Sequence, residues 1–150
     1  MKQIFLLRHA KSDWSTMGQK DFDRPLAKRG VNDALLIAQH IQDMGYSIDM
    51  VFCSTAQRTK ETFDLCADSF NFKIEKATYL EELYFGTVDT LVDLIKSLNE
   101  KFSSVLVVGH NPTMQFFLEE LTGKTLNNFS TCGLAQICTE NSWKNLSLKN

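Results

Sequence analysis

The sequence lacks the features that mark several specialised classes of protein. No apolar run approaches the ~20 residues that a helix needs to cross a bilayer, and the N-terminus enters a strand-like run without a signal-peptide core. The four cysteines contain no CxxC pair, and three of them lie in apolar segments, so neither a zinc site nor a disulfide framework is expected. Free thiols and the missing leader predict a cytoplasmic protein.

A large excess of charge of one sign is also lacking. The formal net charge is −2 at pH 7, which argues against a chain devoted to binding nucleic acid or an anionic membrane. With 43% hydrophobic and 23% charged residues, the composition is that of a globular protein large enough to bury a core. Because no repeat, low-complexity tract or linker divides the 150 residues, we expect one domain over residues 1–150.

Apolar runs that suit buried strands alternate with segments of helical periodicity. Strands are expected at residues 4–7, 50–53 and 105–108, with a weaker edge strand at 72–74. Helices are expected between residues 26 and 45, at 56–69, at 91–98 and from about residue 112 onward. The face of the first helix that we expect to be buried comprises Val31, Ala34, Leu35, Ala38 and Ile41.

The order of these elements predicts the fold class. Strands that alternate with helices favour an α/β protein, here a three-layer α/β/α sandwich with a mostly parallel sheet. The last thirty residues alternate better as strands around Glu140-Asn141, which predicts a closing antiparallel hairpin at the C-terminus. The polar segment 12–24 follows the first strand and is expected to form a long loop, of the kind that is often functional.

Cationic side chains follow three of the apolar runs. Arg8 and His9 end the first run, Arg58 follows Ser54 after the second, and His110 follows the last strong strand. Parallel strands place their carboxyl ends at the same edge of a sheet, where ligands bind, so these side chains can converge. Two arginines and two histidines together suit a polyanion, and phosphate fits best because planar guanidinium groups bind its oxygens in pairs.

Each of these residues taken alone has a simpler interpretation. Arg58 would be a solvated helix residue, His110 a satisfied turn histidine and Glu82 a surface carboxylate. His40, which lies off the apolar stripe of its helix, is expected to be a solvated histidine with no part in the chemistry. The joint occurrence of the cations at strand ends is therefore what indicates a site.

Three segments resemble the signature blocks of the histidine phosphatase superfamily. They are Leu7-Arg8-His9-Ala10, residues 54–62 (STAQRTKET) and Val108-Gly109-His110-Asn111-Pro112. Residues 21–26 (DFDRPL) followed by residues 28–30 (KRG) further resemble the small SixA-like branch of phosphohistidine phosphatases. Thr55 and Thr59 depart from the pattern, since proline and alanine are usual at these two positions.

The resemblance implies a phosphoglycerate-mutase-like fold and a role for each residue. His9 would be the nucleophile and become transiently phosphorylated, and Arg8, Arg58 and His110 would complete the phosphate-binding pocket with it. Glu82 would protonate the leaving group, with the adjacent Glu81 as the alternative donor. No metal or other cofactor is expected, because no carboxylate or histidine cluster has metal-ligand spacing.

Physical chemistry favours the same roles. His9 must be neutral to attack phosphorus, and neighbouring cations lower the pKa of an imidazole. The arginines and a protonated His110 would stabilise the charge that develops on the phosphoryl oxygens during in-line transfer.

Three functions remain open from the sequence. A phosphatase acting on phosphohistidine of a protein is favoured, because the short segments between the motifs leave little chain for a cap over the site. The second is a small-molecule phosphomonoesterase or a phosphoglycerate-mutase-like enzyme, and the third is a non-catalytic module that binds phosphoproteins, which retention of His9 argues against. The expected partner is a phosphorylated protein, such as one with a phosphohistidine domain, or a small phosphate ester. We expect a monomer that binds neither nucleic acid nor membrane.

Overall fold

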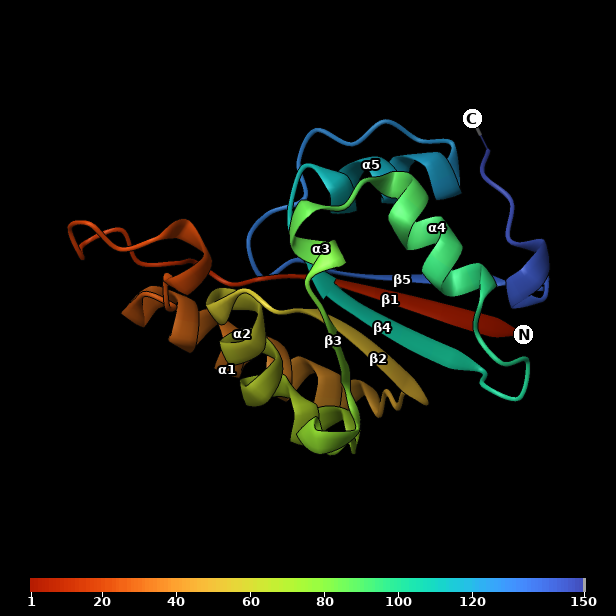
Figure 1. The fold of residues 1–150 in the computed structure, drawn as a ribbon. Coiled ribbons are helices and arrows are strands. Elements are labelled where there is room, and N and C mark those ends of the chain that lie inside the picture. Colours follow the sequence, from red (N-terminus) through yellow and green to blue (C-terminus); the bar gives the residue numbers. More distant parts are fainter. Residues whose placement is uncertain (150) are drawn as a thin grey trace.

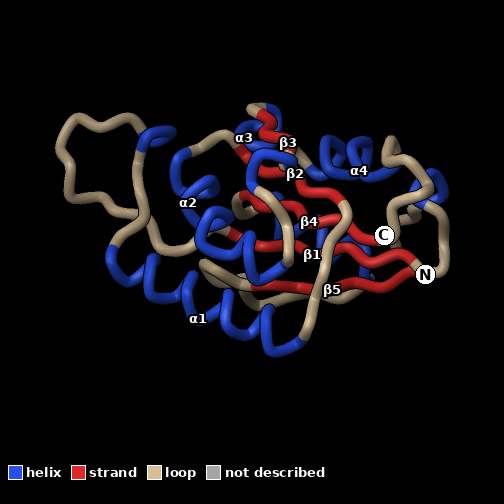
Figure 2. Tube along the Cα trace, turned by 90° about the horizontal axis from the view of Figure 1, so that it is seen from below, coloured by secondary structure: helices blue, strands red, loops and turns tan. Residues whose placement is uncertain are grey.

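A five-stranded sheet forms the centre of the protein, as the computed structural model of residues 1–149 shows. Its strand order is β3-β2-β4-β1-β5, and Figure 2 shows the strands in this order. Pairing is parallel except between β1 and β5, which run antiparallel. The strands are β1 (Lys2–Arg8), β2 (Met50–Ser54), β3 (Thr78–Leu80), β4 (Ser104–Gly109) and β5 (Leu134–Thr139).

Helices cover both faces of this sheet (Figure 1), which confirms the expected three-layer α/β/α arrangement. One face carries α1 and α2, and the other carries α4 and α5. The helices are α1 (Lys28–Met44), α2 (Gln57–Cys66), the four-residue α3 (Glu82–Phe85), α4 (Val88–Lys96) and α5 (Thr113–Thr122). Within residues 1–149, no helix is long and apolar enough to cross a membrane.

The central strands are apolar on both sides because both sides are buried. In β1, Ile4 and Leu6 pack with α4 and α5, whereas Phe5 and Leu7 pack with α1 and α2. All four side chains are fully buried. This alternation of direction along a strand explains why a continuous apolar run was needed there.

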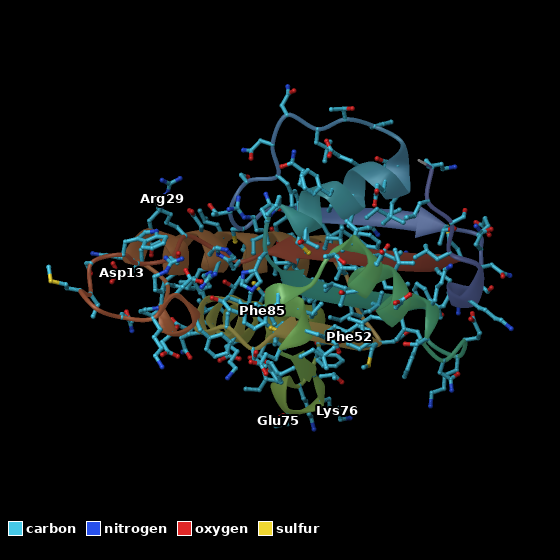
Figure 3. The ribbon with its side chains drawn as sticks, turned by 45° about the horizontal axis from the view of Figure 1, so that its top comes forward. Asp13, Arg29, Phe52, Glu75, Lys76 and Phe85 are labelled. Carbon is cyan, nitrogen blue, oxygen red and sulfur yellow. The ribbon has the colours of Figure 1, made fainter. Side chains whose placement is uncertain are left out.

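A long segment projects between β1 and α1 (Figure 1), and Figure 3 shows Asp13 on it. Its base is closed by an antiparallel bridge between Ser12 and Leu26 and by the bond from Asp13 N–H to Pro25 O (2.8 Å). The segment contains a short 3₁₀ helix, Asp21–Asp23. The expected loop therefore folds back toward the carboxyl edge of the sheet.

Two local predictions were wrong on the α1–α2 side of the sheet. Leu35 was expected in the buried face of α1 but is 51% exposed, because Ala38 and Ile41 pack against the sheet while Ala34 packs with Ala10 and Leu26. No strand forms at residues 72–74. The Phe72 N–H instead bonds to the carbonyl of Ala67, the first residue of the preceding 3₁₀ helix (Ala67–Phe70). The edge strand of the sheet is β3.

The predicted C-terminal hairpin was also wrong. In the described part of this segment, up to residue 149, only β5 is a strand, and it pairs with β1 rather than with the tail that follows. Trp143 begins a 3₁₀ helix and is fully buried, with its indole N–H bonded to Phe102 O (2.9 Å). The Glu100 carboxylate accepts the N–H groups of Trp143 and Lys144, so side-chain partners replace the strand pairing that the alternating pattern suggested.

Candidate active site

The carboxyl ends of β1, β2 and β4 bring the sequence-predicted histidines together. Arg8 at the end of β1 pairs in register with Gly109 at the end of β4, so His9 and His110 leave the sheet side by side. Their ring centroids are 5.3 Å apart. Arg58 reaches the same place from the first turn of α2, which follows β2.

These side chains share a pocket of about 330 Å³. It is lined by His9, Asp21, Arg58, Tyr84, Phe85, His110 and Asn111. The pocket thus combines three of the expected cationic groups with residues from the projecting segment and from α3. Figure 3 shows Phe85 on α3, and its side chain is 73% exposed.

His9 is held as a neutral imidazole of defined tautomer. Its Nδ1 lies 2.7 Å from Ala10 O, and since a carbonyl only accepts hydrogen bonds, Nδ1 carries the proton. Nε2 therefore keeps its lone pair. Burial lowers the pKa of His9 to about 4, with smaller contributions from Arg58 and Arg8. The sequence argument had named only the neighbouring cations, whereas loss of hydration is the larger cause.

The two arginines are anchored differently. Arg58 donates through Nη1 to Asp21 O (2.8 Å) and through Nη2 to the Asp21 carboxylate (3.1 Å). Arg8 lies outside the pocket lining and donates from Nη1 to Phe129 O (3.0 Å), a carbonyl that also accepts the Asn111 side-chain amide. In both arginines Nε is buried and has no hydrogen-bond partner among residues 1–149.

His110 is placed by β2 as well as by its own strand. Its Nε2 lies 2.8 Å from the hydroxyl of the fully buried Ser54, and its Nδ1 is buried without a partner in the described part of the chain. Burial, followed by repulsion from His9 and Arg58, lowers the pKa of His110 to about 3. The structure therefore holds His110 neutral near pH 7, which differs from the protonated form expected from the sequence.

Asp21 links the projecting segment to the pocket. Its carboxylate accepts the hydroxyl of Tyr84 (2.5 Å), two N–H groups of Arg24 (2.9 and 3.0 Å) and one of Arg58. The Tyr84 bond, with smaller effects of Arg24 and Arg58, lowers the pKa of Asp21 to about 2. Arg24 in turn stacks on Trp14, with its guanidinium carbon 3.4 Å from the ring centroid.

Sequence reasoning did not single out Asp21, Tyr84 or Asn111. Asp21 lay inside the block that resembles the SixA-like branch, which was the one available signal. Asn111 adjoins His110, but Tyr84 belonged to an apolar-aromatic segment in which no pattern marked it.

The structure does not bring Glu82 to the pocket. Glu82 is the first residue of α3, and both it and Glu81 are exposed. Leu83 is buried and fixes the rotation of this short helix, so that Tyr84 and Phe85 line the pocket. His40 is exposed on α1 and does not line the pocket, as expected. Among residues 1–149, no group of three or more histidine, cysteine or acidic side chains could hold a metal ion.

Thr59, one of the two departures from the family pattern, stabilises the entry to α2. Its hydroxyl lies 2.8 Å from Ser54 O and 2.7 Å from Ala56 O, so it joins the end of β2 to the first turn of the helix. Thr55 is different, since its buried hydroxyl has no partner within residues 1–149.

Comparison with known proteins identifies close similarities along most of the chain. The family profile of the histidine phosphatase superfamily (branch 1) matches residues 4–102. Phosphohistidine phosphatase SixA of Escherichia coli K12 is 28% identical over 142 residues, which cover 93% of this chain and 87% of that protein. Protein ML1117 of Mycobacterium leprae is 32% identical over 156 residues, covering 96% and 94% of the two chains.

A solved structure shows the same similarity in three dimensions. The protein histidine phosphatase SixA complexed with tungstate superposes with a TM-score of 0.85 at 27% sequence identity. The superposition covers 98% of this chain and 92% of that one. It confirms the predicted fold class, whereas the profile match ends before the strand that carries His110.

Proposed function

Since this chain belongs to the histidine phosphatase superfamily (branch 1) and is a phosphatase, we propose that it hydrolyses phosphohistidine on a phosphorylated protein through a phosphohistidine on its own His9. Arg8, Arg58 and His110 bind the phosphoryl group in this proposal. The related SixA of Escherichia coli is a phosphohistidine phosphatase, and the similar SixA structure holds tungstate, a tetrahedral oxyanion shaped like phosphate. Both relatives support the substrate class.

One observation carries the proposal, namely a set of buried nitrogens that lack partners. Arg8 Nε, Arg58 Nε and His110 Nδ1 have no hydrogen-bond acceptor among residues 1–149. Leaving a buried donor unpaired costs about 1–3 kcal/mol, so such groups are rare away from functional sites. Arg58 and His110 line the pocket with His9, and Arg8 is the residue before His9, so these three donors suit the acceptor oxygens of a phosphoryl group.

The state of His9 supports its role as the nucleophile. With the proton held on Nδ1 by Ala10 O, Nε2 forms a bond to phosphorus while the bond from phosphorus to the substrate's imidazole nitrogen breaks. The substrate's ring carries a proton on its other nitrogen and leaves as neutral imidazole. A water then attacks the phosphorylated His9 and gives its proton to solvent, and inorganic phosphate leaves with neutral His9 restored.

The state of Asp21 favours a phosphoramidate over an alkyl ester as the substrate. An alkoxide leaving group needs a proton from an acid, but the only carboxylate among the pocket-lining residues is Asp21, whose pKa is lowered to about 2. At neutral pH Asp21 is ionised and has no proton to give. A phosphorylated imidazole that is protonated on its other nitrogen leaves as a neutral molecule, so it needs no such acid.

The rim of the pocket suits a phosphoryl group carried by a protein. Phe85 at this rim is 73% exposed, and the Asp21 side chain is 45% exposed. A large partner can therefore contact the rim while its phosphohistidine enters. An exposed aromatic side chain beside a polar pocket is typical of protein-binding surfaces.

The test compares turnover of three substrate classes by the same protein. Hydrolysis rates are measured for a phosphohistidine protein, for phosphoramidate and for a panel of sugar phosphates. We expect kcat/KM to be highest for the phosphohistidine protein. A sugar phosphate that exceeded it would contradict the proposed substrate and favour the small-molecule phosphomonoesterase.

The nucleophile is tested with two histidine variants. His9→Ala is expected to abolish turnover and trapping of radiolabelled phosphate, whereas His40→Ala, a matched exposed histidine, keeps both. Wild-type turnover by His9→Ala would show the proposed mechanism to be wrong.

A further inference from the structure

The hydrogens available around the Ser54 hydroxyl determine whether Ser54 or His110 donates in the hydrogen bond between them. Ser54 ends β2, is fully buried, and places its hydroxyl oxygen 2.8 Å from His110 Nε2. The same oxygen accepts the N–H of Ala56 (3.3 Å). A hydroxyl has one hydrogen to donate, and among residues 1–149 the acceptor beside it is His110 Nε2.

The opposite direction leaves more groups unsatisfied. If His110 Nε2 donated, two N–H groups would converge on the Ser54 oxygen and the serine hydrogen would have no acceptor among the described residues. Buried hydroxyl hydrogens without an acceptor are costly. The geometry therefore favours a bond from the Ser54 hydroxyl to Nε2, which places the imidazole proton on Nδ1.

The surroundings of His110 favour the neutral imidazole. Because a neutral ring has a single N–H, the tautomer decides whether Nδ1 can donate a hydrogen bond. Burial is the main reason that the pKa of His110 is lowered to about 3. Arg58, Arg8 and a protonated His9 lower it further, and Asp21 acts in the opposite direction. The charged and titratable groups that face the ring are His9, Arg58, Arg8, Asp21 and Tyr84, the last with its ring 5.4 Å away.

We propose that Ser54 is a positioning residue that holds neutral His110 in its Nδ1–H tautomer, so that His110 donates a hydrogen bond to the phosphoryl group without being protonated. This proposal rests on the proposed function of the pocket. It explains how a neutral His110 contributes a donor, since Nδ1 is the buried nitrogen that has no partner in the described chain. With the other tautomer, Nδ1 would present a lone pair to the negative oxygens and repel them.

A first experiment reads the tautomer without any substrate. In the phosphate-free protein with ¹⁵N-labelled histidine at pH 7.5, the His110 resonances, assigned with a His110→Asn variant, are expected to show a protonated Nδ1 and an unprotonated Nε2. A protonated Nε2 would overturn the proposal. Because this measurement needs no turnover, its result is independent of whether the phosphohistidine substrate is correct.

A second experiment reads the consequence for catalysis. Ser54→Ala removes the donor and is expected to lower kcat/KM by about ten- to a hundred-fold at pH 8. In the same ¹⁵N measurement, Ser54→Ala is expected to shift the proton of neutral His110 from Nδ1 towards Nε2. Ser54→Cys, which keeps a weak donor, is expected to lie between wild type and Ser54→Ala at each pH.

Thr55→Val is the matched control, since it removes the neighbouring buried hydroxyl, which has no partner within residues 1–149. Its pH profile should follow that of wild type. A loss of activity in Ser54→Ala with the Nδ1–H tautomer of His110 unchanged would indicate a merely structural role and refute the proposal.

Discussion

At the residue scale, the phosphate-binding role proposed for Arg58 has to be reconciled with its ion pair with Asp21. Asp21 contacts Arg58 through both its carboxylate and its carbonyl, so it orients the guanidinium while opposing its charge. The Asp21 side chain is 45% exposed, so the opposing effect is screened by solvent and modest. Tyr84 and Arg24 share the carboxylate and limit the movement of the projecting segment.

Asp21→Asn tests this balance, because asparagine keeps an acceptor oxygen and loses the negative charge. We expect inorganic phosphate to inhibit the variant about two- to five-fold more strongly than wild type, since the repulsion of a dianion is removed. The inhibition constant is measured at fixed ionic strength. Asp23→Asn in the same 3₁₀ helix is the control and should leave inhibition unchanged. Weaker inhibition of Asp21→Asn would show that orientation of Arg58 outweighs charge.

Glu82→Gln tests the proton donor that the family resemblance implies. Because Glu82 does not line the pocket, we expect ester and phosphoramidate hydrolysis both to stay within about two-fold of wild type, whereas loss of a proton donor would lower ester hydrolysis about ten-fold or more. Both rates are measured on the same preparation. Glu81→Gln is the matched variant, because both carboxylates are exposed beside α3. A loss in Glu82→Gln confined to ester hydrolysis would show that Glu82 is the proton donor after all.

At the element scale, the parts of the site that could be predicted are those set by strand ends. Arg8, His9 and His110 follow long apolar runs, and such runs are visible in any buried parallel strand. Asp21 and Tyr84 could not be found in this way. They reach the pocket from a projecting segment and a four-residue helix whose positions depend on tertiary contacts.

The same reason accounts for the strands that were predicted wrongly. β3 has three residues, and its existence depends on pairing with β2 rather than on a pattern of its own. The tail alternates like a strand, yet Trp143 is fixed by Glu100 and by the carbonyl of Phe102, more than forty residues earlier. Such partners are distant in sequence, and periodicity carries no information about them.

Gly30→Ala tests the packing of α1 against the chain that leaves His9. A Cβ at Gly30 would clash with the carbonyl oxygen of Lys11, which also accepts the N–H of Ala27 (2.9 Å). We expect a loss of about 1–3 kcal/mol in the free energy of unfolding, because the backbone itself must move. Activity should fall as well, since Lys11 is two residues from His9.

The measurement is urea unfolding together with phosphatase activity. Gly18→Ala is the control, because its Cβ would meet no atom within 4 Å. It should cost about 1 kcal/mol through its left-handed backbone alone and leave activity unchanged. Wild-type stability of Gly30→Ala would contradict this account of the helix packing.

At the scale of the whole molecule, one arrangement serves both packing and chemistry. Parallel pairing of β2, β4 and β1 buries the strands between two helical layers and delivers their carboxyl ends to one edge. The same burial removes water from His9 and His110 at that edge and lowers the pKa of both. The burial that keeps His9, the proposed nucleophile, neutral is therefore a property of the fold, and it has a consequence for stability.

Stability should decrease as the pH falls below about 6.5. An exposed histidine in the unfolded chain has a pKa of about 6.5, whereas burial lowers the pKa of His9 to about 4 and that of His110 to about 3. Between these values the unfolded chain binds more protons than the folded protein, so the free energy of unfolding falls with pH. Asp21, whose pKa is about 2, contributes to the pH dependence only below about pH 4.

The prediction is checked by urea unfolding at pH 7.5, 6.5, 5.5 and 4.5. Each histidine should account for a loss on the order of 1–2 kcal/mol between pH 7 and pH 5. The double variant His9→Gln/His110→Gln should flatten the curve in this range, whereas His40→Gln, which alters the exposed histidine, should keep the wild-type slope. An unchanged slope in the double variant would mean that the buried histidines are not the groups whose protonation weakens the fold.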